Sequence, residues 1–140
     1  LIDKASELSK GKKKIGSTLK GIGPTYMDKT GRNGLRVGDL EMEGWNEKFE
    51  NLISKHLNII TNFNVEIDFD IESLKKEFLN SVDFMNNLEF IDSEEFFHDS
   101  IKKDYKILAE GAQGSLLDID FGTYPYVLHQ IQHLQVHVLV

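Results

Sequence analysis

The residues best suited to chemistry in this sequence lie in a glycine-rich stretch near its start. The run G-I-G-P-T-Y-M-D-K-T-G-R occupies residues 21–32 and follows I-G-S-T at residues 15–18. Glycine lets backbone N–H groups approach a ligand closely, and successive N–H groups form an anion-binding concavity, to which the Ser17 and Thr18 hydroxyls can add donors. Lys29 and Arg32 would supply positive charge, and a guanidinium can grip phosphate or carboxylate with two hydrogen bonds. The pattern predicts a loop that binds a phosphorylated small molecule.

A second glycine-rich turn, E-G-A-Q-G at residues 110–114, follows the short apolar segment 105–109. The segment is β-prone, and a strand that runs into a glycine-rich turn is how open α/β sheets present ligand contacts. The Gln113 amide can read a purine edge or a sugar hydroxyl, or it can simply stabilise the turn. The plainer alternative for the stretch at residues 21–32 is a solvated loop in which the glycines serve only turns.

Helices are expected around these two segments. Residues 1–9 have the apolar spacing of a helix, and Gly11 stands where a helix-ending glycine is expected. The many glycines of residues 15–40 predict neither helix nor strand. Residues 116–120 read as a second buried segment, in which Asp118 and Asp120 are either a metal pair or hydrogen-bonded structural aspartates.

A helical insert is predicted at about residues 45–103. Its first helix runs from Trp45 to about Phe63 on an apolar stripe, and Asp70 caps a second. Asp92 caps a third, with Glu95 completing a capping box, and this helix stops near residue 104. The insert contains two histidines: His56 is interpreted as structural, and His98 as exposed or structural. The acidic residues of the insert are assigned to helix caps and polar faces rather than to a metal site.

The composition excludes several classes of protein. The chain has 140 residues, enough for one core, and its net charge of -7 argues against a general nucleic-acid binder. It has no cysteine, which excludes a disulfide framework or a cysteine-ligated zinc site in this sequence. No apolar run reaches membrane-spanning length, so no membrane partner and a cytoplasmic location are expected.

The glycine-rich residues resemble one known family. The run G-I-G-P-x-Y-x-x-K-x-x-R, the following N-G-L-R-V-G-D-L and the distant E-G-A-Q-G-S-L-L-D-I-D-F-G-T-Y-P-Y-V are similar, in the same order, to adenylosuccinate synthetases. The resemblance covers residues 1–127. It implies an α/β fold of the P-loop type, with a large mixed or parallel sheet. It also implies an internal fragment of a longer enzyme, since the chain begins with Leu1 and the family is much longer.

The resemblance also implies a reaction and its partners. In the family, GTP phosphorylates the 6-oxygen of IMP, and L-aspartate then displaces the phosphate to give adenylosuccinate, with Mg²⁺ organising the phosphoryl group. Carried over to matching positions, Thr18 and Gln113 contact IMP, and Lys29 is the signature's active lysine, with an electrostatic role. Arg32 reaches the IMP phosphate of the neighbouring subunit, which makes a homodimer part of the site. Leu128 stands where the family has an IMP-binding threonine.

Other functional parts of the family have no counterpart in this sequence. The GTP loop with its catalytic residues is expected before Leu1, and the guanine-recognition and aspartate-binding segments are expected after Val140. The Mg²⁺ ligands are therefore expected outside the chain. The 140 residues alone are expected to be inactive. Two other functions stay open. One is a non-catalytic anion- or nucleotide-binding module, and the other is a metal-binding or interaction protein built on the histidine-rich end.

Residues 128–140 form an aberrant tail. The family continues V-T-S-S-N-T after Val127, whereas this chain reads V-L-H-Q-I-Q-H, with His129, His133 and His137 at the spacing of a helical metal site. Deleting one A from GTT-ACT-TCA-TCA-AAT-ACA-ACA gives GTT-CTT-CAT-CAA-ATA-CAA-CA, which encodes V-L-H-Q-I-Q followed by a His or Gln codon. The hypothesis is therefore a single-base frameshift, and the histidines are its by-products.

Resequencing this junction in genomic DNA tests the frameshift. We expect the missing base to reappear in independent reads, or the gene to be interrupted at this point. An intact CTT codon in several reads of a functional gene would end the hypothesis. A zinc or nickel titration of the chain is the second measurement, and no stoichiometric binding is expected.

Overall fold

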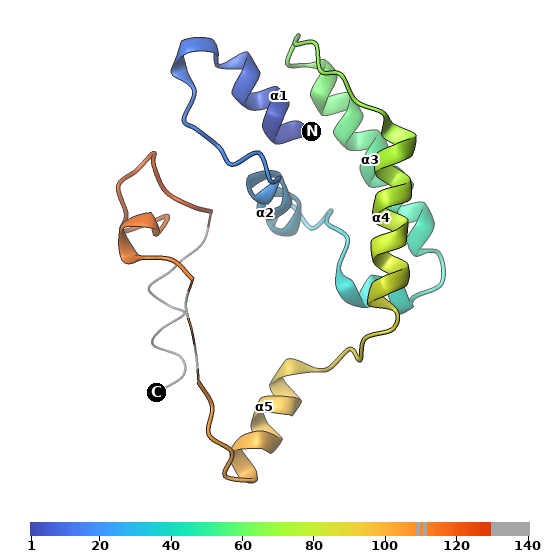
Figure 1. The fold of residues 1–140 in the computed structure, drawn as a ribbon, viewed down its shortest axis with the longest axis vertical. Coiled ribbons are helices and arrows are strands. Elements are labelled where there is room, and N and C mark those ends of the chain that lie inside the picture. The colour runs from blue at the N-terminus through green and yellow to red at the C-terminus, as the bar shows by residue number, and fades with distance from the viewer. Residues whose placement is uncertain (109, 111, 130–140) are drawn as a thin grey trace. The chain divides into compact units, whose positions relative to one another are not determined.

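The computed structural model describes residues 1–108, 110 and 112–129, and Figure 1 draws it as a ribbon coloured from the N-terminus to the C-terminus. The chain divides into two compact units. One unit contains residues 1–67 and the described residues from 112 onward, and the other contains residues 68–110. The regular secondary structure of the described residues is helical throughout. Within this part of the chain, no helix has the length and apolar character needed to span a membrane.

Three α-helices build the first unit: α1 (Ile2–Ser9), α2 (Ile22–Thr30) and α3 (Trp45–Thr61). Helix α1 packs against both α2 and α3, and the fully buried side chain of Ala5 lies on α1. Short 3₁₀ helices lie between α1 and α2 at Gly11–Lys13 (η1) and between α2 and α3 at Val37–Glu41 (η2), and a third follows α5 in the chain at Ser115–Leu117 (η3). The predicted first helix is confirmed, and Gly11 follows it with a φ of +54°, a conformation that suits glycine.

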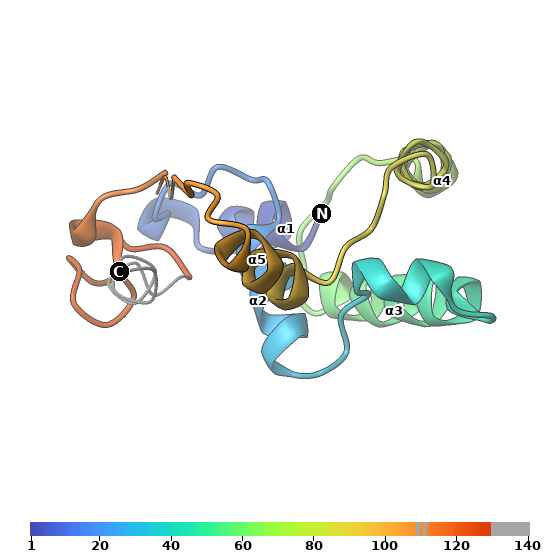
Figure 2. The same ribbon diagram turned by 90° about the horizontal axis from the view of Figure 1, so that it is seen from below.

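Helix α3 is 17 residues long and is seen along its length in Figure 2. The apolar residues of its predicted stripe are all buried or half-buried, whereas most of its polar residues are exposed. Trp45 and Phe49, one turn apart, pack with ring centroids 6.3 Å apart, and Ile60 is only 7% exposed. The stripe is therefore packing surface, as the sequence predicts.

The second unit contains α4 (Ile71–Met85) and α5 (Ser93–Lys102). The Asp70 carboxylate accepts hydrogen bonds from the N–H groups of residues 72 and 73, and Asp92 does the same for residues 94 and 95. Such caps satisfy N–H groups that have no partner inside the helix. Both predicted caps are confirmed, and so are the three helices predicted within residues 45–103.

The loop predicted for residues 15–40 is wrong in its central part, because Ile22–Thr30 forms α2. Gly23 and Pro24 occupy the second and third helical positions, where the missing N–H of proline costs no intrahelical hydrogen bond and its fixed φ suits the helix. Gly21 precedes the helix with a φ of +76°, which a residue with a side chain rarely adopts. These residues therefore start a helix rather than prevent one.

The predicted strand at residues 105–109 is not found. Residues 105–108 have no regular secondary structure, and Ala109 lies outside the described residues. A strand needs a neighbouring strand to satisfy its N–H and C=O groups, and no strand is present in the described ranges. The predicted buried segment at residues 116–120 is also largely wrong: Leu116 is 69% exposed, whereas Asp118 is fully buried.

The cap of α5 provides a stability test. Replacing Asp92 with alanine removes the acceptor of two N–H groups and should cost about 1 kcal/mol of helix stability. The helical content of residues 93–96, measured by ¹³Cα chemical shifts in the full chain, should fall. Asp99→Ala, in the middle of the same helix, is the matched control and should not lower it. An equal loss of helix in both variants would contradict the assignment of Asp92 as the cap.

Candidate functional site

Two carboxylates of α1 hold the glycine-rich loop at residues 14–21. The Glu7 carboxylate accepts hydrogen bonds from the N–H groups of Gly16 (3.1 Å) and Ser17 (3.4 Å). The Asp3 carboxylate accepts one from the Gly21 N–H at 3.0 Å. Asp3 and Glu7 are four residues apart, so they lie on the same face of the helix. The loop is thus fastened to α1 at both of its ends.

The sequence predicts that the glycine-rich loop binds an anion. In the structure the loop N–H groups already bind an anion of the protein itself, the Glu7 carboxylate on α1. Its residue is 6% exposed, and the Lys10 ammonium lies 2.8 Å from the other carboxylate oxygen. Lys10, and then the Gly16 N–H, lower the pKa of the Glu7 carboxyl below its ordinary value against the opposing effect of burial. In the described conformation the N–H groups of Gly16 and Ser17 therefore donate to Glu7. The Thr18 side chain, next in the chain, is exposed.

Helix α2 is anchored to α3 through the carboxylate of Asp28, a buried residue that is 6% exposed as a whole. One oxygen lies 2.5 Å from Lys55 Nζ, and the other lies 2.5 Å from His56 Nε2. Burial raises the pKa of the Asp28 carboxyl, but the hydrogen bonds from Lys55 and His56 outweigh burial and leave the pKa below its ordinary value. The structural interpretation of His56 is confirmed. Its partner Asp28, within the signature run, was not anticipated from the sequence.

Lys29 and Arg32 are exposed at the C-terminal end of α2. The Lys29 ammonium lies 5.7 Å from the centroid of the Tyr26 ring, one turn earlier, at the distance of a cation–π contact. The Arg32 backbone has a φ of +60° and donates its N–H to the Lys29 carbonyl at 3.2 Å. The structure thus places the two predicted cations on one turn.

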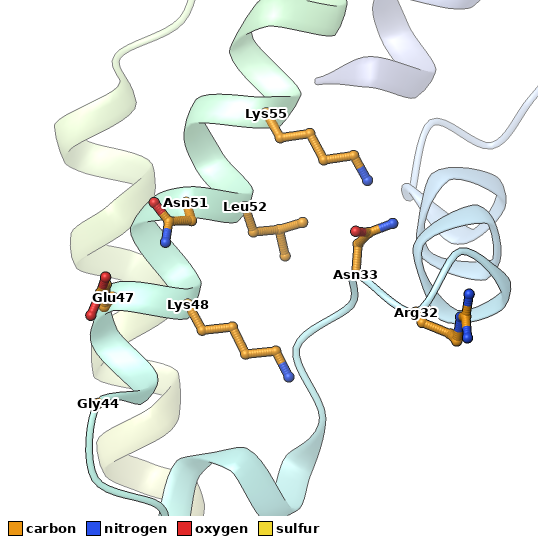
Figure 3. Close-up of a pocket in the computed structure, with 8 residues that line it drawn as sticks. All are labelled: Arg32, Asn33, Gly44, Glu47, Lys48, Asn51, Leu52 and Lys55. Atoms are coloured by element: carbon orange, nitrogen blue, oxygen red, sulfur yellow. The ribbon is translucent and has the colours of Figure 1, made fainter.

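An open pocket of about 460 Å³ lies between this turn and α3 (Figure 3). Its lining residues are Arg32, Asn33, Gly44, Glu47, Lys48, Asn51, Leu52 and Lys55. Two of its cations are already paired, because Lys48 lies 2.5 Å from an Asp39 oxygen and Lys55 binds Asp28. Lys48 and Lys55 were not predicted as site residues. On the sequence they read only as charges on the polar face of a helix.

The segment at residues 112–129 belongs to the same unit. Gln113 is exposed, and Asp118 is buried and accepts hydrogen bonds from the N–H groups of residues 120 and 121. The structural interpretation of Asp118 is thereby confirmed. The Leu128 N–H donates to the Leu117 carbonyl at 2.9 Å, and the His129 ring stacks on Tyr26 with centroids 6.5 Å apart. Of the tail predicted to be aberrant, residues 130–140 lie outside the described residues.

No group of three or more His, Asp or Glu side chains able to hold a metal ion occurs among the residues that the structure describes. The described residues therefore do not fit a Mg²⁺ site.

A family model for adenylosuccinate synthetase matches residues 1–135 of the chain. The chain belongs to the adenylosuccinate synthetase family. The adenylosuccinate synthetase of Christiangramia forsetii is 63% identical over 127 residues, and that of Flavobacterium johnsoniae is 59% identical over the same length. These matches cover 91% of this chain and 30% of each relative. The predicted resemblance is confirmed.

A solved structure gives the same assignment. The fully ligated adenylosuccinate synthetase from Plasmodium falciparum matches with a TM-score of 0.79 and 34% sequence identity, over 94% of this chain and 30% of that one. The chain therefore spans less than a third of the length of these adenylosuccinate synthetases. The solved relative is an α/β enzyme, in line with the predicted fold class, but the predicted mixed or parallel sheet lies in none of the described residues and stays a prediction.

The Glu7 contacts predict a pH response of the loop. Because the pKa of Glu7 is lowered from its ordinary 4.5, its contacts are complete above that pH and are lost as the pH falls through the lowered value. The Gly16 and Ser17 amide ¹H shifts should report this titration in NMR spectra of the full chain. Glu7→Gln should abolish it. The matched change Asp3→Asn should affect Gly21 alone, and an unaltered Gly16 titration in Glu7→Gln would refute the contact.

Proposed function

We propose that this chain is part of an enzyme that ligates IMP and L-aspartate to adenylosuccinate with GTP, releasing GDP and phosphate, in AMP biosynthesis. The single observation that carries the proposal is the family match over residues 1–135. The exposed positions of Lys29, in the last turn of α2, and of Arg32, just after the helix, support it, since both cations are available to an anionic substrate. The use of GTP and Mg²⁺ is proposed because the chain belongs to this family.

The proposed roles follow from the chemistry of each side chain. The Thr18 hydroxyl donates a hydrogen bond to the IMP phosphate, and the Arg32 guanidinium binds the phosphate of IMP held by the neighbouring subunit of a homodimer. Lys29 stabilises negative charge that develops during phosphoryl transfer, and the Gln113 amide contacts IMP from the same chain. Leu128 has no hydrogen-bonding side chain, so the contact of the family's threonine at this position would be lost.

Glu7 defines how the phosphate would meet the loop. With Gly16 and Ser17 donating to Glu7, the phosphate would be bound by the exposed side chains of Thr18 and Arg32 rather than by those two backbone groups. A carboxylate beside the bound phosphate would also repel it, because like charges at short range disfavour each other. The Lys10 ammonium, at 2.8 Å from Glu7, offsets part of this repulsion.

A chimeric enzyme tests the proposal. Residues 1–127 of this chain would replace the matching 127 residues of the Christiangramia forsetii synthetase, which differ at about a third of positions. The purified chimera should form adenylosuccinate from IMP, aspartate and GTP with Mg²⁺, measured by chromatography. A folded chimera that binds IMP without forming product would favour a non-catalytic nucleotide-binding module. One that neither binds IMP nor forms product would refute both functions.

The same chimera tests Arg32. Because a hydrogen bond to a charged group contributes about 1.5–3 kcal/mol, Arg32→Ala should raise the KM for IMP by about tenfold to a hundredfold. Lys12→Ala removes another exposed cation, from η1, and is the control, with kinetic constants close to those of the parent. Equal effects of the two substitutions would show that only the general positive charge matters.

A further inference from the structure

The carboxylate of Asp28 lies directly before the two cations of the proposed site. Both of its oxygens are used, one by Lys55 and one by His56, and these two partners are neighbours on α3. Two contacts from adjacent residues of one helix fix the direction of a carboxylate more strictly than a single contact does. The side chain therefore sets the rotation of α2 about its axis as well as its distance from α3.

The backbone of Asp28 fixes the turn that follows. Its carbonyl oxygen accepts hydrogen bonds from the N–H groups of Asn33 (2.9 Å) and Gly34 (3.2 Å). Arg32 lies inside the loop that these bonds close, in a left-handed backbone conformation. One residue thus holds α3 through its side chain and the Arg32 turn through its main chain.

We propose that Asp28 is a positioning residue for Lys29 and Arg32, acting through its contacts with Lys55 and His56. The inference rests on the proposed function, since it assumes that these cations bind substrate. Asp28 is itself buried, and its two carboxylate oxygens bind Lys55 and His56. Its effect is to direct the last turn of α2, and hence the long side chains of Lys29 and Arg32, toward the phosphate.

A small rotation of α2 is enough to matter. Lys29 is adjacent to Asp28 in the chain, and Arg32 follows about one helical turn later. The guanidinium of Arg32 lies at the end of a long side chain. Any change in the angle of α2 is therefore enlarged at the guanidinium. A displacement of about 1 Å at a catalytic or binding group can lower the rate by about a hundredfold.

The Asp39–Lys48 pair provides a matched control. It joins η2 to α3 with the same separation of 2.5 Å, and its carboxylate side chain is 17% exposed, compared with 9% for Asp28. Asp39 does not belong to α2. Asp39→Asn therefore removes a comparable ion pair from the same unit without releasing the signature helix.

The first measurement uses the full chain and does not depend on activity. Amide hydrogen exchange at Asn33 and Gly34 should accelerate about tenfold or more in Asp28→Asn, because the turn loses its anchor, and should stay unchanged in Asp39→Asn. If Asp28→Asn does not fold, Lys55→Met, which removes one of the two partners, should show a smaller change in the same direction. Unchanged exchange in the folded variant would overturn the proposal.

The second measurement uses the active chimera. Asp28→Asn should raise the KM for IMP by about tenfold to a hundredfold and leave the KM for GTP unchanged, whereas Asp39→Asn should alter neither. A merely structural role would lower the amount of folded enzyme, which reduces the apparent kcat at constant KM, and that result would overturn the proposal. If the parent chimera folds but is inactive, the proposed function fails, and the exchange measurement alone decides whether Asp28 holds the turn.

Discussion

A carboxylate that leaves water must be given hydrogen-bond donors, and this requirement organises the first unit of the molecule. Glu7 meets it with two loop N–H groups and a lysine, and Asp28 meets it with a lysine and a histidine. The loop N–H groups and the two α3 side chains come from a different segment than their acceptor, whereas Lys10 lies one turn after Glu7 at the end of α1. Satisfying the two charges therefore fastens the glycine-rich loop to α1 and α2 to α3, while the fully buried apolar core of the unit is small.

The two carboxylates hold different parts of the proposed site. Glu7 shapes the loop that carries Thr18, and Asp28 directs the turn that carries Lys29 and Arg32. The residues that would touch substrate are exposed, and the residues that hold them in place are buried. Exposed binding residues held by buried residues are usual in proteins, because binding groups often lie on loops that a rigid support positions.

The sequence predicts those features that depend on neighbouring residues. The caps at Asp70 and Asp92 and the apolar stripe of α3 follow from local spacing, and all three are confirmed. Helix α2 was missed because glycine and proline were counted as helix breakers, although in the first turn they are tolerated.

The carboxylate contacts were missed for a different reason. Glu7 and Gly16 are nine residues apart, and Asp28 and His56 are twenty-eight apart, so tertiary packing alone brings them together. No periodic pattern in the sequence marks such pairs. The site residues were instead named through the family resemblance, and their convergence on one nucleotide stays a prediction.

The left-handed backbone at Arg32 has an evolutionary consequence. At a φ of +60°, glycine would be free of the penalty of about 1–2 kcal/mol that a side chain incurs there. Selection for thermal endurance alone would therefore favour glycine at this position. In the proposed function the guanidinium is needed at this position, so substitutions meant to raise thermal stability should leave Arg32 unchanged.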